Sequence, residues 1–151
     1  MFLARSSVKE REDEVRSFLS SHPSVALVLA AVNFEWTVSR AVLFLSTTAN
    51  VPLRQKMRDY HSPKRYNELW RHEVMQNGHP ALAKLVRNWA SVLKGFDARN
   101  VLVHGKDRHT TRMVTPKVQA LLKGACYVDT YCRDIGKPLY GPMPKRRKSA
   151  V

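Results

Sequence analysis

The chain has 151 residues, 44% hydrophobic and 25% charged, which suits one globular domain and excludes disorder over most of its length. It carries 26 Lys and Arg against 12 Asp and Glu, a net charge of +14, and all of the excess lies after residue 50. Because neutralising phosphates releases condensed counterions, such a chain attracts polyanions. We therefore expect nucleic acid as the partner, with an acidic protein as the alternative.

The two cysteines indicate a reducing environment. Cys126 and Cys132 are six positions apart in a segment that reads as helix, which places them about 120° apart around the axis and roughly 9 Å apart along it. This geometry is poor for a disulfide. The sequence has no CxxC pair and no Cys/His spacing typical of zinc sites, so we expect a cytoplasmic protein without a metal or a cofactor.

A long apolar segment, residues 25–45, has the length of a membrane span. Glu35 and Arg40 lie near its centre, and on insertion scales each charge there costs about 2.5–3.5 kcal/mol. The highly charged residues 1–14 do not resemble a secretory signal. We therefore expect the central helix of a bundle, capped by Ser24, and no membrane segment.

Three polar residues of this predicted helix form one narrow stripe. Asn33, Thr37 and Arg40 fall within about 60° of one another on a helical wheel. Two interpretations stay open: the stripe lines a cleft, where Asn33 and Arg40 assist the chemistry, or it simply faces water.

Helical periodicity accounts for most of the remaining chain up to residue 135. Gly95 is expected to end one helix, and Asp97 to cap a short one that follows. No segment alternates with period two, so the sequence predicts an all-α, up-and-down bundle of four to five main helices with short extra helices over residues 1–135. Residues 136–151, which include the run KRRK, are expected to form a basic, flexible tail. The predicted helices cover residues 8–20, 24–47, 53–61, 63–75, 81–94, 98–103 and 116–135.

The segment FDARNVLVHGK, residues 96–106, combines three polar side chains with an apolar face. On a helical wheel that starts at Ala98, Arg99, Asn100 and His104 lie away from the apolar side. Asn100 and His104 are four positions apart and can touch, whereas Arg99 stands about 140° from His104. Such a face is either a solvated surface or a site that some other element completes.

These three side chains have abilities that suit RNA cleavage. A histidine exchanges protons at neutral pH, which both the attack of a 2′-hydroxyl and the departure of the leaving group require. The guanidinium of Arg99 can hold a phosphate through two hydrogen bonds and stabilise its growing negative charge. The amide of Asn100 can orient the His104 ring or bind a phosphate oxygen.

The residues Arg99-Asn100-Val101-Leu102-Val103-His104-Gly105 resemble the Arg-x4–6-His signature of the HEPN superfamily of small helical-bundle proteins. In that family the residue after the arginine is often polar, and glycine often follows the histidine, as here. The order of helices expected above is also similar to that of the family over about residues 8–135.

The resemblance implies a metal-independent endoribonuclease that leaves 2′,3′-cyclic phosphate ends. It implies His104 as general acid and base, Arg99 as the ligand of the scissile phosphate and Asn100 as a polar auxiliary. An acidic auxiliary residue in the long N-terminal helix pair would correspond to Glu35. Members of the family commonly form homodimers whose two motifs face one RNA, and many are toxins or antiphage effectors that a nucleotidyltransferase-like or other antitoxin holds in check.

The same resemblance leaves an alternative, because some members of the family bind nucleotides or partners without cleaving RNA. The chain is then a helical module that binds nucleic acid or an acidic protein. The basic segments serve both functions, and three aromatic residues near the first segment either stack on RNA or belong to the core. The aromatic residues are Tyr60, Tyr66 and Trp70, and the basic residues expected to contact RNA are Arg54, Arg58, Lys64, Arg65, Lys106, Arg108 and Arg112.

Overall fold

The computed structural model describes residues 7–105, 109–140, 143 and 145–146. All regular structure in this part of the chain is helical, as the sequence predicts. Five helices have ten or more residues, and α3, α5 and a single 3-10 turn are shorter. The elements are α1 (Val8–Ser17), α2 (Pro23–Leu45), α3 (Asn50–Met57), α4 (Pro63–Glu73), η1 (Met75–Asn77), α5 (Leu82–Leu85), α6 (Trp89–Val103) and α7 (Thr111–Asp134).

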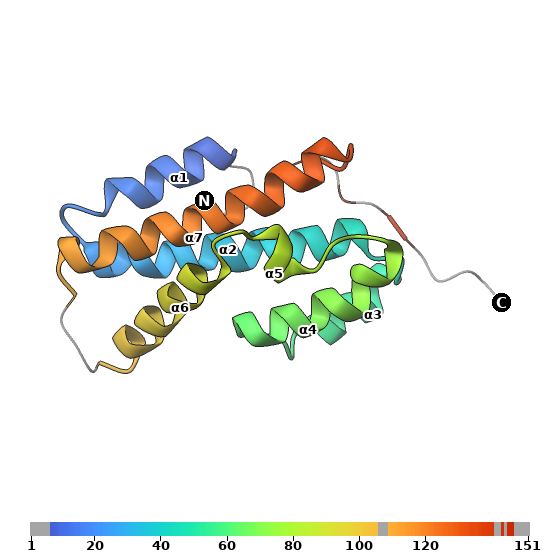
Figure 1. Cartoon of the computed structure of the whole chain (residues 1–151), viewed down its shortest axis with the longest axis horizontal. Coiled ribbons are helices and arrows are strands. Elements are labelled where there is room, and N and C mark those ends of the chain that lie inside the picture. Colours follow the sequence, from blue (N-terminus) through green and yellow to red (C-terminus); the bar gives the residue numbers. More distant parts are fainter. Residues whose placement is uncertain (1–6, 106–108, 141–142, 144, 147–151) are drawn as a thin grey trace.

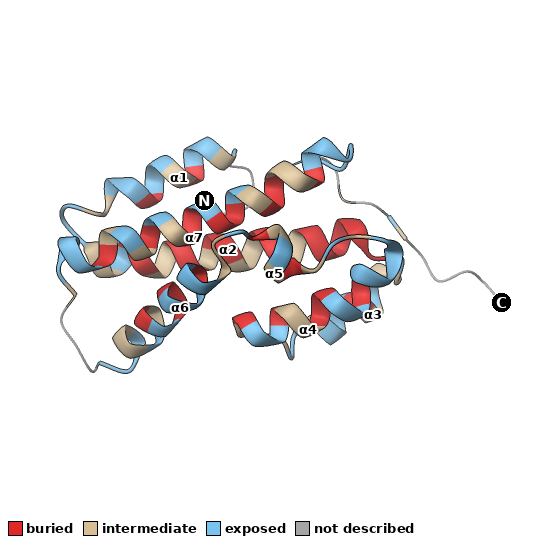
Figure 2. Ribbon diagram, viewed as in Figure 1, coloured by how far each residue is buried: buried red, intermediate tan, exposed pale blue. Residues whose placement is uncertain are grey.

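Helix α2 is the centre of the bundle. It packs against α1, α3, α4, α6 and α7, and α1 and α6 run opposite to α2 and α7, whereas α4 runs in the same direction as α2 (Figure 1). The helix is apolar and long enough to cross a membrane, but 61% of its most apolar window is buried inside the protein. Buried residues line its contacts with the neighbouring helices (Figure 2), so the expected central helix is confirmed. It begins at Pro23, one residue before the predicted cap.

The helix expected at residues 81–94 is instead two helices, and α6 runs through Gly95 to Val103. Gly95 is buried, and a Cβ atom added to it would lie 2.9 Å from Cγ of Leu121 on α7. The glycine therefore permits a close approach of α6 and α7 and does not end a helix. Asp97, the predicted cap, lies on the exposed side of α6.

Part of the segment after residue 135 packs on the bundle. Leu139 is fully buried, the Arg11 guanidinium donates a hydrogen bond to the Tyr140 hydroxyl, and Nε of Arg146 donates to the carbonyl of Thr48 at 3.0 Å. The expectation of a flexible tail is therefore wrong for these residues, because the tail supplies an apolar side chain to the core and donors to main-chain carbonyls. The rest of the KRRK run, residues 147–148, lies outside the described residues.

Candidate functional site

The polar motif lies on the C-terminal half of α6. Ala98 is buried, as the wheel predicts, Arg99 is half-buried and Asn100 is exposed. One terminal nitrogen of the Arg99 guanidinium donates to Oδ1 of Asn100 at 3.1 Å. The Nε atom of Arg99 is buried and has no hydrogen-bond partner among the described residues. The Arg99 guanidinium therefore keeps hydrogen-bonding capacity for a further group.

Helix α2 brings a carboxylate to this arginine. Burial raises the pKa of the Glu35 carboxyl above its ordinary value, and the positive charges of Arg99 and His61 oppose this rise. Glu35 is thus a partly desolvated acid within the electrostatic field of Arg99. A group of this kind can accept a proton or hold the guanidinium in place, and perturbed acids next to a charge partner are enriched at functional sites.

Helix α4 adds a tyrosine to the same place. The pKa of Tyr66 is raised to about 12, mainly by burial and also by the charge of Glu35, while a hydrogen bond with Ser39 and the charge of Arg99 act to lower it. The hydroxyl of Tyr66 therefore keeps its proton at neutral pH and can donate a hydrogen bond. Ser39 lies one turn after Glu35 on the same face of α2. We call Glu35, Ser39, Tyr66, Arg99 and Asn100 the Arg99 cluster.

His104 lies at the edge of this cluster. It is the residue that ends α6, with φ −85° and ψ 6°, and its backbone N–H donates to the carbonyl of Asn100 at 3.1 Å. Its side chain is exposed, and no hydrogen bond or ion pair joins its ring to Arg99, Asn100 or Glu35, all of which are described. One copy of the chain therefore brings Arg99, Asn100 and Glu35 together, without the histidine.

The second predicted set of auxiliary residues lies elsewhere. Asn33 and Thr37 are buried, and the hydroxyl of Thr37 donates to the carbonyl of Asn33 at 2.7 Å. Nε of Arg40 donates to the carbonyl of Leu139. The interpretation that this stripe faces water is therefore wrong for Asn33 and Thr37, whereas Arg40 does line a cleft.

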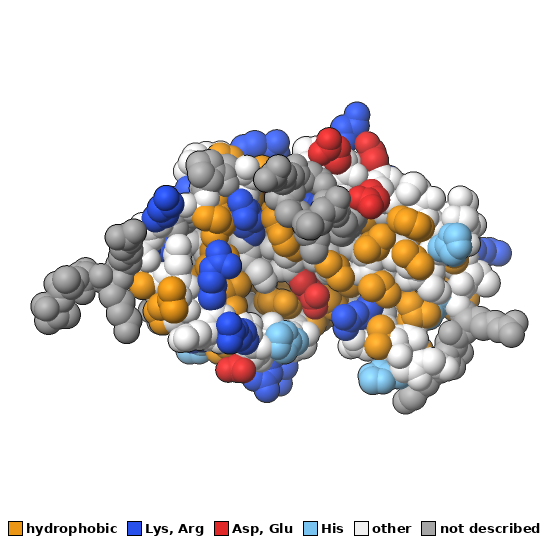
Figure 3. Space-filling view, turned by 180° about the vertical axis from the view of Figure 1, so that it is seen from behind, with side chains coloured by type: hydrophobic (Ala, Val, Ile, Leu, Met, Phe, Trp, Pro, Cys, Tyr) orange, Lys and Arg blue, Asp and Glu red, His pale blue; other side chains and the backbone are white. Residues whose placement is uncertain are grey.

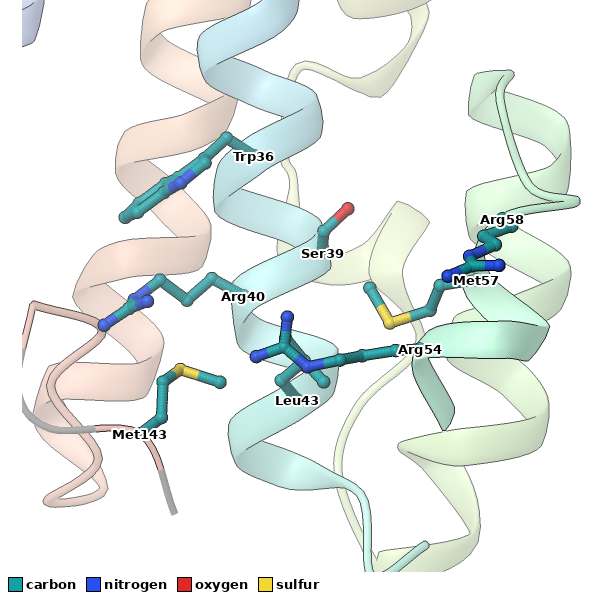
Figure 4. Close-up of a pocket in the computed structure, with 8 residues that line it drawn as sticks. All are labelled: Trp36, Ser39, Arg40, Leu43, Arg54, Met57, Arg58 and Met143. Carbon is teal, nitrogen blue, oxygen red and sulfur yellow. The ribbon is translucent and has the colours of Figure 1, made fainter. Parts of the chain in front are cut away.

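That cleft is a pocket of about 480 Å³ between α2 and α3 (Figure 4). A neighbouring pocket of about 640 Å³ shares Arg58 with it and extends to the start of α4. We call the two pockets together the basic groove. The first pocket is lined by Trp36, Ser39, Arg40, Leu43, Arg54, Met57, Arg58 and Met143, and the second by Arg58, Asp59, His61, Ser62 and Arg65.

The basic residues expected to contact RNA separate into groups. Arg54, Arg58 and Arg65 line the basic groove, whereas Lys64 lines a different pocket, of about 340 Å³. Arg112 is exposed in the first turn of α7. Residues Lys106 and Arg108 lie outside the described part of the chain.

The aromatic residues near the basic segment are largely internal. Trp70 is fully buried, and its Nε1 donates to the carbonyl of Pro80 at 2.9 Å. Tyr66 is 6% exposed, so it serves the Arg99 cluster and not base stacking. Sequence reasoning missed Tyr66 and Ser39 as members of the site. The position of Ser39 one turn after Glu35 was a usable signal, whereas the sequence gives no sign that Tyr66 reaches α2.

Comparisons of the sequence with protein-family models and with curated proteins, and a search of the solved structures, gave no match.

Proposed function

We propose that this chain is a metal-independent endoribonuclease of the HEPN type, in which Arg99 binds the scissile phosphate. The observation that carries the proposal is the electrostatic interaction of the motif arginine with a half-buried acid. Arg99 keeps an unpartnered, buried Nε and interacts electrostatically with Glu35, which lies one turn before Ser39, a lining residue of the groove rich in arginine.

In the proposed reaction the 2′-hydroxyl of one nucleotide attacks the adjacent phosphorus. A new P–O2′ bond forms, the P–O5′ bond breaks, and the product is a 2′,3′-cyclic phosphate. His104 takes the proton of the 2′-hydroxyl and later returns one to the leaving 5′-oxygen. Arg99 stabilises the charge that grows on the phosphate oxygens, and Glu35 and Asn100 hold its guanidinium in the reactive orientation.

The position of His104 favours a homodimer, in which a second copy completes the site. The N-terminal part of α2 carries a second stripe, made of partly exposed apolar side chains, in which Val25 is 41% exposed. We call it the apolar stripe. Val103, directly before His104, is 60% exposed. Hydrophobic side chains gather on one half of the face that Figure 3 shows, over the end of the bundle where α2 begins. The other members of the stripe are Val28, Leu29 and Val32.

We further propose a cytoplasmic toxin or antiphage effector that a nucleotidyltransferase-like or other acidic antitoxin neutralises. The charge of +14 supports an acidic partner as well as RNA. An antitoxin that covers the Arg99 cluster would block the substrate and bury the apolar stripe.

The test is cleavage of RNA by the purified protein in EDTA, with the end groups of the products identified. Wild type is expected to leave 2′,3′-cyclic phosphate ends, and the separate variants Arg99→Ala and His104→Ala to lose the activity while still folding, as cooperative thermal unfolding shows. The idea fails if wild type cleaves no RNA in EDTA and His104→Ala harms cells as much as wild type does.

One observation favours a second function, a helical module that binds nucleic acid or an acidic protein without cleaving. His104 is exposed and its ring is not joined to Arg99. If this module is the function, both variants above keep their affinity for RNA and neither wild type nor variant produces cyclic phosphate ends.

A further inference from the structure

We propose that the basic groove binds single-stranded RNA beside the cleaved bond, with one nucleobase in the pocket between α2 and α3 and phosphates on its arginines. The link to a cleaved bond rests on the proposed ribonuclease function. Binding in the groove can nevertheless be measured without any cleavage.

The first pocket combines the two kinds of surface that a nucleotide needs. Its apolar lining comes from Leu43, Met57 and Met143, which converge from α2, α3 and the C-terminal segment (Figure 4). The guanidinium of Arg54 extends from α3 toward Leu43, and Arg58 stands on the α3 side of the opening. An apolar surface accepts the face of a base, and the cations at its rim accept the phosphate.

The charges of this groove are available for a ligand. Arg54 and Arg58 are exposed, and no ion pair involves either of them within the described part of the chain. Lys56, which lies between them in the sequence, is in contrast ion-paired, because its Nζ lies 2.7 Å from a carboxylate oxygen of Glu73. The fold therefore neutralises Lys56 and leaves its neighbours exposed in the groove, where Asp59 is the acidic lining residue.

Both pockets border the Arg99 cluster. Ser39 lines the first pocket and hydrogen-bonds with Tyr66, and it follows Glu35 by about 6 Å along the axis of α2. His61 lines the second pocket and interacts electrostatically with Glu35. A strand that lies in the groove therefore passes Ser39, a member of the cluster that contains the arginine proposed to hold the scissile phosphate.

The apolar pocket favours single-stranded RNA over a duplex. A base can enter it only when it is unpaired, because the bases of a duplex are stacked inside the helix. A duplex would contact the arginines through phosphates alone and leave the pocket empty. An acidic protein is the other polyanion that this charge suits, but carboxylates would use the arginines without a base for the pocket.

The test measures the affinity for a fluorescent, single-stranded dodecamer with 2′-O-methyl riboses, which cannot be cleaved because the attacking hydroxyl is blocked. Wild type is compared with the double variant Arg54→Gln/Arg58→Gln. The matched control is Lys9→Gln/Lys84→Gln, which removes the same charge from exposed positions outside the groove. The groove variant is expected to bind about five- to tenfold more weakly, and the control to bind like wild type.

The salt dependence and an abasic probe separate the two parts of the proposal. For single strands each phosphate contact contributes about 0.7 to the slope of log affinity against log salt, so the groove variant should lose about 1.4. An abasic dodecamer with the same phosphates is expected to bind wild type several-fold more weakly than the normal one. Equal affinity for the two probes, or stronger binding of a duplex, overturns the base pocket.

The result distinguishes this inference from the proposed function. If the groove variant binds and cleaves as wild type does, the groove is not the RNA site and its charge serves an acidic protein. If wild type and the control bind as expected but unmodified RNA stays intact, the ribonuclease proposal fails and the groove remains a site for single-stranded RNA. Thermal unfolding of both double variants shows that each is folded.

Discussion

Glu35 on α2 and Arg99 on α6 interact electrostatically, yet the pKa of Glu35 stands above its ordinary value because burial outweighs the attraction. The arginine thus compensates only part of the desolvation of the carboxylate. A charge kept where it opposes folding is typical of a functional position, since natural sites retain groups that lower stability. This relationship has a measurable consequence for stability.

We predict that Glu35→Gln stabilises the fold at neutral pH. The folded state raises the pKa of this acid, so its ionisation opposes folding above the unfolded pKa, and glutamine removes that term. Below about pH 4 the glutamate is protonated in both states, and the gain should disappear. Urea unfolding of wild type and variant at both pH values measures the effect. A variant that is less stable than wild type at neutral pH contradicts the prediction.

The matched control is Glu73→Gln, for which we predict the opposite sign. Burial would raise the pKa of Glu73, but hydrogen bonds from Lys56, Thr48 and Ser46 together lower it. The folded state therefore favours the carboxylate, and its contribution is present above the unfolded pKa and lost as the pH falls. At neutral pH the variant should lose about 1–3 kcal/mol of unfolding free energy, and the loss should shrink in acid.

A third prediction concerns the close contact of α6 with α7. A Cβ atom at Gly124 would lie 2.7 Å from Cγ2 of Val92 and 3.1 Å from Cε2 of Phe34. Gly124→Ala should therefore destabilise the protein by about 1–2 kcal/mol, because overpacking exceeds the gain of about 1 kcal/mol in helix propensity. In the background Val92→Ala the nearest atom is gone, and the same change should be neutral or favourable. Equal effects in the two backgrounds would refute this explanation.

A fourth prediction tests the packing of the C-terminal segment. Leu139 is fully buried and its carbonyl accepts a hydrogen bond from Arg40. Leu139→Ala should lower the unfolding free energy by about 2–4 kcal/mol. Ile135→Ala, at a position that is 39% exposed, is the control and should change it by less than about 1 kcal/mol. Similar, small effects of both changes would mean that the segment does not stabilise the bundle.

The sequence predicts the class of the fold well, because helical periodicity and the long apolar segment are local properties. Its errors arise where a distant segment decides the local structure. Gly95 reads as a helix stop, but the side chain of Leu121 occupies the space that a larger residue would need. The flexible tail is misjudged for the same reason, since nothing near Leu139 reveals the core that receives it.

The sequence likewise predicts some residues of the candidate site and misses others. The motif names Arg99 and Asn100 from their spacing, and the resemblance names Glu35, whose interaction with Arg99 requires α2 and α6 to pack together. Tyr66 joins them from a third helix, α4, and no pattern in the sequence predicts that its side chain lies near Glu35. His104 is exposed, as its place away from the apolar side of the wheel predicts, but a wheel does not show which side chains its ring can reach from the end of the helix.

The last prediction tests the second copy. Val25 lies in the first turn of α2 on the apolar stripe, and it is 41% exposed. Val25→Glu should leave a single copy as stable as wild type, because an acid near a helix N-terminus contributes about 0.3–1 kcal/mol. The same charge buried between two copies is unfavourable, so the dimer should dissociate at least about tenfold more readily, which corresponds to about 1.4 kcal/mol.

Val51→Glu is the matched control, since Val51 is 69% exposed and also lies in the first turn of a helix. Sedimentation equilibrium over a range of concentrations measures the association of wild type and both variants, and cleavage is followed in the same samples. Activity should fall with the fraction of dimer if His104 of one copy serves Arg99 of the other. A fully monomeric Val25→Glu protein that cleaves RNA as well as wild type would show that one copy holds the whole site.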